Sequence, residues 1–402
     1  NCLVFLIFFV RLNIRLKIIN IMKKIFSRFS YPVELYIQKS ERSFLAFIIL
    51  CFLLAMLSAP YPNLAMWVGF LFAAYAAVAN DSIQTIGTFI ASNQDKKWWV
   101  LWLFLGGIFI ATITYSWLKF NGDVSNGRLL SKGFEEAPTS FHFLQVAAPV
   151  FLLILTRLRM PVSTTFILLT SFAANPKAVG GVLAKSMSGY ILAFLIGFLV
   201  FISIAKIAKK YFTGKARFSW TIAQWITSGT LWSVWLMQDA ANIAVYLPRN
   251  MNFSTFFGFI SIVFFGLGML LYYKGGRIQK IVTEKSVVTD VRFATIIDFI
   301  YCILLFYFKL YSDVPMSTTW VFIGLLGGRE LGMTLRKSGS NSFKKTILLI
   351  IKDFSFATIG LIVSIAIAIG VNDQLSFASM IETLPSSFSE GISKFFIKLG
   401  LK

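Results

Sequence analysis

Two short polar motifs, each built around one aspartate, lie inside long apolar runs of the sequence. The first is Ala-Asn-Asp-Ser-Ile-Gln at residues 79–84, within the apolar run 64–91. The second is Gln-Asp-Ala-Ala-Asn at residues 238–242, within the run 221–247. Carboxylate and amide oxygens are hard ligands that suit Na⁺ and similar cations. Because an ionisable side chain inside a membrane is costly, the two aspartates predict a functional site there.

Each aspartate motif is followed by the sequence Pro-x-Ser-Thr-Thr, at residues 161–165 and again at residues 315–319. The serine follows the aspartate by 82 residues in the first half and by 78 residues in the second. Proline breaks a helix, and hydroxyls beside free N–H groups at a helix start suit a tetrahedral oxyanion. Such hydroxyls also serve as helix caps and as polar contacts between membrane helices. Two motifs that recur in the same order at nearly the same spacing favour a duplicated transport site.

The residues expected in this site form two groups, and none of them is expected to be catalytic. The side chains expected to bind the coupling cation are Asp81, Gln84, Asp239 and Asn242, with Na⁺ at Asp81 and Asp239 as one alternative. The side chains expected to bind the substrate are Asn80, Ser163, Thr164, Thr165, Gln238, Ser317, Thr318 and Thr319. A charged oxyanion in a dry site needs several such hydrogen-bonding groups.

The composition indicates a polytopic membrane protein. Of 402 residues, 57% are hydrophobic and 14% are charged, and the mean hydropathy is +0.75. This leaves too little polar surface for a water-soluble protein, so the lipid bilayer is the expected partner. The net charge of +21 comes from basic residues between the apolar runs; this is typical of cytoplasmic loops, and no nucleic-acid partner is expected. The three cysteines predict no disulfide or metal site, and the single histidine, His142, excludes chemistry that needs a histidine pair.

Nine apolar segments, most of them about 20 residues long, predict membrane helices. Their bounds are 43–59, 64–91, 98–117, 141–158, 178–205, 221–247, 253–273, 294–310 and 346–371. The expected organisation is a cytoplasmic N-terminal extension (1–42), an extra membrane helix (43–63), a first repeat (64–205), a basic cytoplasmic loop (206–220), a second repeat (221–371) and an amphipathic tail (372–402). Residues 1–21 precede a Met-Lys-Lys sequence and are interpreted as over-extended translation, with a signal peptide or an amphipathic anchor as the alternative.

The loop charges predict opposite orientations for the two halves. With the basic N-terminus inside, the segment that carries Asp81 runs inward, and the charge-balanced loop 118–140 lies outside. The basic stretch 206–217 then lies inside, so the segment that carries Asp239 runs outward. The loop 274–292, with five basic residues against two acidic ones, should lie inside. These orientations predict an inverted-topology repeat.

The expected fold is all-α, with broken helices and helical hairpins. One break is expected at Asn80-Asp81, because freed backbone groups there would suit a bound ion. Further breaks are expected at the two prolines. The short apolar stretches 166–174 and 320–331 are too short to cross a bilayer, so each is interpreted as half of a hairpin or as the continuation of a broken helix.

The four motifs together resemble those of the inorganic phosphate transporter (PiT) family, whose pattern is Gly-Ala-Asn-Asp-Val-Ala-Asn and Pro-Val-Ser-Thr-Thr-His in each inverted half. The matching positions in the aspartate motifs are Asn80, Asp81, Asp239 and Asn242, with Gln84 and Gln238 in place of asparagines. Residues 161–165 match in full, and residues 315–319 match except at Met316. The histidine of the family is Phe166 in one half and Trp320 in the other. The chain is thus similar to a divergent member of this family.

The resemblance implies a symporter of inorganic phosphate that is coupled to Na⁺ or H⁺ and has no cofactor. The expected location is the bacterial inner membrane, as a multi-pass protein. A sulfate or other oxyanion permease is the main alternative, and a membrane enzyme or channel that uses the two aspartates is a third. The absence of histidine from the motifs counts against an enzyme. Lys185 and Lys352 lie inside apolar segments, where either could balance the charge of a substrate; a homo-oligomer remains open.

Overall fold

The computed structural model describes residues 39–130, 134–158, 160, 162–173, 175–273, 290–311, 316–338 and 341–372, with isolated positions beyond 372. The chain divides into two compact units, residues 1–49 and 50–402. All contacts described below lie within the second unit. Most of the expected N-terminal extension and C-terminal tail, and the stretch 274–289, lie outside the described residues.

Every regular element among the described residues is a helix. The helices are α2 (Lys39–Ser58), α3 (Pro62–Ser92), α4 (Trp98–Lys119), α5 (Phe143–Arg157), α6 (Thr164–Ile167), the 3₁₀ helix η1 (Leu169–Phe172), α7 (Pro176–Tyr211), α8 (Phe218–Ala244), α9 (Phe253–Tyr272), α11 (Val291–Tyr311), α12 (Thr318–Leu335) and α13 (Phe343–Val371). Within the described part of the chain, six of them contain a stretch long and apolar enough to cross a membrane: α3, α4, α7, α9, α11 and α13. The protein is therefore an all-α, multi-pass membrane protein, as predicted.

The long helices present large apolar side chains to their surroundings. On α9, Phe253, Phe257 and Phe265 are each more than 60% exposed. In a membrane these side chains would contact lipid. A helix satisfies its own backbone hydrogen bonds, which hydrocarbon requires because it offers no partners. The first turn is satisfied by a cap, since the Asn252 side chain accepts a hydrogen bond from the backbone N–H of Thr255 at 2.9 Å.

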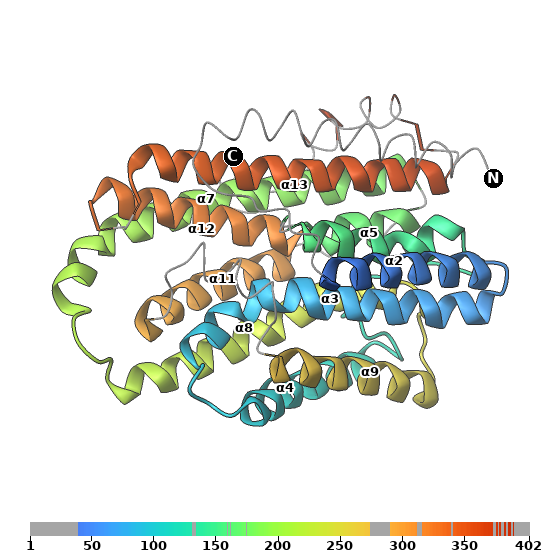
Figure 1. Ribbon diagram of the computed structural model, residues 1–402, viewed down its shortest axis with the longest axis horizontal. Helices are drawn as coiled ribbons and strands as arrows, with labels where there is room; N and C mark the ends of the chain where they lie inside the picture. The colour runs from blue at the N-terminus through green and yellow to red at the C-terminus, as the bar shows by residue number, and fades with distance from the viewer. Residues whose placement is uncertain are drawn as a thin grey trace. The chain divides into compact units, whose positions relative to one another are not determined.

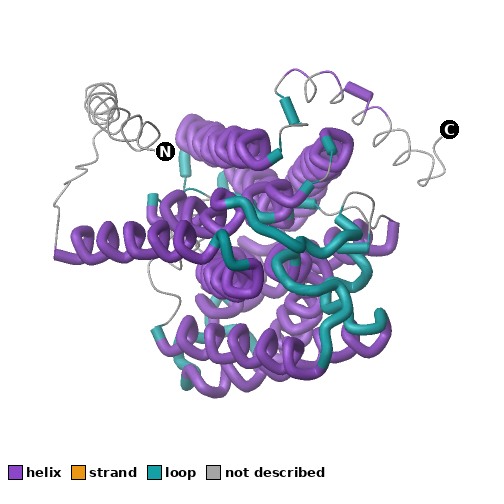
Figure 2. Tube along the Cα trace, turned by 90° about the vertical axis from the view of Figure 1, so that its right-hand side faces the viewer, coloured by secondary structure: helices purple, strands orange, loops and turns teal. Residues whose placement is uncertain are grey.

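Most of the long helices of the second unit form three groups (Figure 1). Helices α7, α12 and α13 lie together at one side, α4 and α9 lie at the other, and α3, α8 and α11 lie between them. Figure 2 shows this unit turned by 90°, with a group of loops on the side that faces the viewer. The two helices that carry the aspartate motifs, α3 and α8, contact each other in the middle group. The aspartate motifs are therefore central in this unit.

Helices α7 and α12 approach so closely that their backbones touch. A Cβ atom on Gly324 would collide with the carbonyl group of Tyr190, and one on Gly328 would collide with that of Phe194. Small residues four apart are the usual device for such close contact between membrane helices. Only glycine therefore fits at these two positions of α12.

The predicted helix break at Asn80-Asp81 is wrong. Helix α3 runs without interruption from Pro62 to Ser92, and α8 runs likewise through Asp239. The polar atoms of these motifs come from side chains, so the backbone keeps its helical hydrogen bonds. The chain does leave the helical conformation before Ser163 and before Ser317, where α6 and α12 begin. The short element α6 continues into η1, whereas α12 is 18 residues long.

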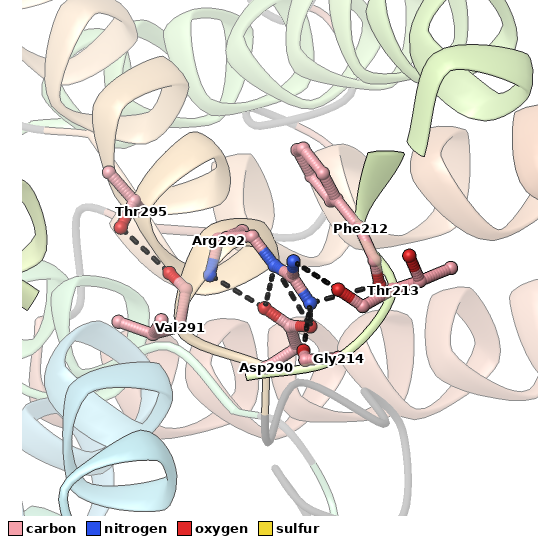
Figure 3. A network of polar contacts seen from close by, with 7 residues as sticks. All are labelled: Phe212, Thr213, Gly214, Asp290, Val291, Arg292 and Thr295. Carbon is pink, nitrogen blue, oxygen red and sulfur yellow. Dashed lines mark hydrogen bonds and ion pairs between the residues drawn. The ribbon is translucent and has the colours of Figure 1, made fainter. Parts of the chain in front are cut away.

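A clamp of polar contacts joins the connection between α7 and α8 to the start of α11 (Figure 3). Arg292 donates hydrogen bonds to the carbonyl oxygens of Phe212 at 2.9 Å and Gly214 at 3.2 Å, and it forms an ion pair with Asp290 at 2.6 Å. Burial opposes ionisation of Asp290, but the hydrogen bonds from Arg292 outweigh it and lower the pKa of that carboxyl group. The clamp fixes where α11 begins.

Candidate functional site

The serine of each Ser-Thr-Thr sequence is a helix cap. Ser163 Oγ accepts a hydrogen bond from the backbone N–H of Phe166 at 3.2 Å, and Ser317 Oγ accepts one from Trp320 at the same distance. Both serines have extended backbone conformations and are buried. The two serines therefore satisfy backbone groups at the starts of α6 and α12.

The threonines after Ser163 connect the two aspartate motifs. The Thr164 hydroxyl donates a short hydrogen bond to the carboxylate of Asp81. Asn242 Nδ2 lies 3.1 Å from both Thr164 Oγ1 and Thr165 Oγ1, and 2.6 Å from Asp239 Oδ1. One continuous chain of contacts thus leads from Asp81 through Thr164 and Asn242 to Asp239. The structure brings together residues of both aspartate motifs and of the first Ser-Thr-Thr sequence.

Asn80 connects the first aspartate motif to the segment just before Ser163. Its Nδ2 lies 2.6 Å from Asp81 Oδ1 and 2.9 Å from the carbonyl oxygen of Val162. Its Oδ1 accepts a hydrogen bond from Thr156 at 3.3 Å. The Asn80 amide is therefore used to position the carboxylate of Asp81.

The segment that leads into α12 contacts the segment that leads into α6 in two places. Thr165 Oγ1 lies 3.2 Å from the carbonyl oxygen of Met316, just before Ser317. Phe166 and Trp320, at the positions where the resembling family has histidine, pack edge to face with ring centroids 5.5 Å apart. These contacts place the two helix starts next to each other, although the residues are more than 150 positions apart in the sequence.

The remaining predicted site residues are placed less directly. Thr318 Oγ1 accepts a hydrogen bond from Trp235 Nε1 at 3.2 Å. The next residue, Thr319, is also buried. Gln238 points to α11, where its Nε2 donates to the carbonyl oxygen of Leu305 at 2.9 Å. The side chain of Gln84 lies outside what the structure describes. The Thr318 hydroxyl also faces the carboxyl group of Asp239. Thr318 therefore belongs to the same network, whereas this bond of Gln238 joins it to α11.

Both carboxylates of the site are buried, and the positive charge of Arg128 acts on one of them, Asp239. Asp81 is 2% exposed and Asp239 is 3% exposed. Among the described residues, neither forms an ion pair, and Asp239 Oδ2 has no hydrogen-bond partner. Two carboxylates in a medium of low dielectric constant favour the binding of a proton or a cation. Asp239 Oδ2 offers that cation an unused ligand.

Arg128 is a site residue that the sequence did not reveal. It is fully buried, and its guanidinium donates to Gln238 Oε1 and to the carbonyl oxygen of Met237, both at 3.2 Å. The loop charges predict that Arg128 lies in a charge-balanced external loop. The loop instead folds inward through a turn in which Asp123 accepts hydrogen bonds from the backbone N–H groups of Ser125 and Gly127. The turn motif 121–127, rich in Asn, Gly and Asp, could have indicated an ordered loop.

A second arginine fixes the neighbouring loop beyond α8. Arg249 donates to the carbonyl oxygens of Phe134, Glu136 and Leu247 at 2.8–3.1 Å. Burial lowers the pKa of Arg249 to about 10, and Asp123 opposes that shift. The loop that contains Arg128 is therefore fixed on one side by the turn at Asp123 and on the other by the bonds of Arg249 to Phe134 and Glu136.

Asp298 on α11 is a third buried carboxylate that the sequence analysis left unassigned. It is 1% exposed and accepts hydrogen bonds from the hydroxyls of Thr88 on α3 and Ser228 on α8. It stands inside the predicted apolar run 294–310, so the cost of an intramembrane charge could have indicated it.

The two lysines weighed from the sequence lie on α7 and α13. Lys185 is partly buried on α7. Lys352 is exposed on α13, with its ammonium group 5.5 Å from the ring centre of Phe356. Lys352 therefore has a local partner on its own helix rather than a charge in the site.

Comparisons with known proteins add no identification. No family model, curated protein or solved structure matches the chain. Within the described residues, no group of three or more His, Cys, Asp or Glu side chains could hold a metal ion.

Proposed function

We propose that the chain is a secondary transporter that moves inorganic phosphate, or a related oxyanion, across the bacterial inner membrane together with Na⁺ or H⁺. The observation that carries this proposal is the buried network from Asp81 through Thr164 and Asn242 to Asp239. It joins paired carboxylates, which attract a cation, to hydroxyls and amides, which bind an oxyanion. Cation and anion sites in contact are what coupled transport requires.

An inverted-topology repeat accounts for how the helices contact each other. The proposed first repeat contains α3, α4, α5, α6 with η1, and α7; the second contains α8, α9, α11, α12 and α13. Exchanging equivalent helices turns several of the contacts into other observed contacts: α3–α5 into α8–α11, α3–α9 into α8–α4, and α7–α12 into α13–α6. The side-chain contacts also show that α3 and α8 are antiparallel. Asn93 contacts Gln224, whereas Thr88, earlier in α3, and Ser228, later in α8, both donate to Asp298. This pattern supports a pseudo-two-fold axis through the site.

The charges around the site support an anionic substrate. Arg128 brings a permanent positive charge to Gln238, next to Asp239 in sequence. An anion bound near Arg128 and a cation bound near the carboxylates would neutralise each other and the protein charges. Loading both together costs less in a low-dielectric medium than loading either alone.

Sulfate is the second candidate substrate, because it shares the tetrahedral shape of phosphate. The network contains hydroxyl and amide groups, which can donate hydrogen bonds to either anion. A site that also accepts a hydrogen bond from its ligand would favour phosphate, which keeps a proton at neutral pH. The buried carboxylates Asp81 and Asp239 offer such acceptors.

Uptake into proteoliposomes that contain the purified full-length protein tests the proposal. Labelled phosphate and labelled sulfate are supplied in turn, under an inward Na⁺ gradient or an inward H⁺ gradient, with choline replacing Na⁺. Gradient-driven uptake of phosphate supports the proposal, and uptake of sulfate alone would assign the alternative substrate. Uptake of neither anion under either gradient would reject an oxyanion symporter. Asp95→Asn, which changes an exposed carboxylate paired with Lys96, is the matched control for substitutions at the site.

A further inference from the structure

Polar side chains continue from the candidate site along one face of α3. Asp81, Thr85, Thr88 and Ser92 are separated by four, three and four residues, which places them on the same side of a helix. The first three are at most 2% exposed, and Ser92 is partly exposed. A buried face of a membrane helix ordinarily carries apolar or small residues. This polar face therefore needs an explanation.

Asp298 lies beside the middle of this polar face. It accepts one hydrogen bond from Thr88 on α3 at one carboxylate oxygen and one from Ser228 on α8 at the other. Three helices thus contribute a side chain to one buried group.

The polar contacts then reach the end of α3. Asn93 donates to Gln224 Oε1 at 3.0 Å and accepts from Trp225 Nε1 at 3.1 Å, while Gln224 donates to Ser92. Asn93 and Gln224 are buried, but the chain is exposed from residue 94 onward, where Lys96 lies. The line of polar groups therefore joins the buried Asp298 region to the water-accessible end of α3.

Asp298 has no ion-pair partner in the described part of the chain. The titratable and charged groups within the helices that pack on α11 include Asp81 on α3, Asp239 on α8, Arg329 and Glu330 on α12, Lys185 on α7, and Cys302 on α11 itself. Among the described residues, no ion pair involves Asp298, and Arg329 pairs with Glu330. An ionised carboxylate held by two neutral hydroxyls in hydrocarbon is unfavourable.

A proton suits this group better than a metal cation. Na⁺ needs several oxygen ligands around it. The side-chain hydrogen bonds of Asp298 to described residues come from two hydroxyls, each already bonded to a carboxylate oxygen. A proton needs only one carboxylate oxygen, and the hydroxyl that faced it can turn to accept a hydrogen bond. Protonation removes the buried charge and leaves the packing unchanged.

We propose that Asp298 is a proton-binding site, separate from the Asp81–Asp239 pair and reached along the polar face of α3 from the end that carries Lys96. Its role in coupling rests on the proposed transport function: Asp298 takes a proton from water at that end in one state and releases it in the other. The coupling ion would then be H⁺.

Infrared difference spectroscopy tests proton binding without any substrate. The full-length protein in lipid is titrated with acid, and the C=O band of a protonated carboxylic acid in a dry environment is followed. The band should be lost in Asp298→Asn and kept in the control Asp95→Asn. If Asp298→Asn does not fold, Ser228→Ala removes one donor, keeps the carboxyl group and should shift the band. A band that is unchanged in Asp298→Asn, or in Ser228→Ala if only that variant folds, would overturn the proposal.

Transport measurements in proteoliposomes test the coupling role. Asp298→Asn should lose phosphate accumulation driven by a pH gradient, down to the level of protein-free liposomes, while phosphate exchange at equal pH continues. Full accumulation in Asp298→Asn would overturn the coupling role. Failure of the unsubstituted protein to carry phosphate or sulfate would reject the proposed function instead, and the infrared result would still decide whether Asp298 binds a proton.

Discussion

Replacing Thr164 by alanine removes a hydroxyl that serves both aspartate motifs. It donates to the carboxylate of Asp81 and accepts from Asn242 at 3.1 Å. A hydrogen bond to a charged group contributes about 1.5–3 kcal/mol, and loss of this amount weakens binding by about 10- to 100-fold. Because the same atom would bind or position the ligands, the half-saturation concentration for phosphate should rise by that factor. Thr318→Ala should act in the same direction, since Thr318 is the equivalent residue of the other half.

Labelled phosphate uptake by the variant is compared with that of Thr230→Ala. Thr230 is an exposed threonine of α8 whose hydroxyl donates a hydrogen bond to the carbonyl oxygen of Ile226, one turn earlier in the same helix, at 2.8 Å. This control removes the same atoms away from the site and should leave half-saturation unchanged. Thermal melting of both variants reports any loss of folding. An unchanged half-saturation concentration in Thr164→Ala, with normal folding, would show that the hydroxyl is structural and would refute the reasoning.

Four further predictions test the caps, the carboxylates, the buried arginine and the clamp. Ser163→Ala should cost about 1 kcal/mol of stability through the lost cap and leave phosphate half-saturation unchanged; a melting temperature equal to that of the unsubstituted protein would contradict the cap. Asp81→Asn and Asp239→Asn should abolish gradient-driven uptake without loss of protein from the membrane, and retained Na⁺ or pH dependence in both would exclude them as the coupling site. Arg128→Gln should raise phosphate half-saturation more than Arg128→Lys, which keeps the charge; equal values would remove the arginine from anion binding. Asp290→Asn should lower the melting temperature at neutral pH but not at acidic pH, because the lowered pKa of Asp290 contributes stability above its unfolded pKa that is lost as pH falls through its folded pKa; a difference that is the same at both pH values would contradict this.

The helices could be predicted because their signal is local. Each of the nine apolar segments coincides with a helix and extends past it by at most three residues at either end. Length and hydropathy therefore suffice to indicate these helices. The helix starts at Thr164 and Thr318 follow from the Ser caps and the prolines before them. The predicted break at Asn80-Asp81 is wrong because polar residues in an apolar run do not by themselves interrupt a helix. Their side chains supply the polar atoms of the site, and the backbone stays helical.

The site was only partly predictable because its contacts are distant in the sequence. Repetition in the sequence indicated which residues to examine, and Asp81, Thr164, Asn242 and Asp239 do lie in one network. Arg128 contacts a residue 110 positions away, and no local pattern encodes that contact. The charges of a loop indicate on which side of the membrane the loop lies. They do not distinguish a buried arginine from an exposed one.

The glycine contacts between α7 and α12 limit how the protein can move. Gly324 and Gly328 lie directly against the carbonyl groups of Tyr190 and Phe194. A shift of one helix along the other would bring larger side chains of α12 against these carbonyl groups. We therefore expect the two helices to move together as one rigid pair, built on the membrane-spanning helix α7. Any rocking motion that opens the centre to one side and then to the other has its hinge elsewhere, so a crosslink between α7 and α12 would leave turnover intact.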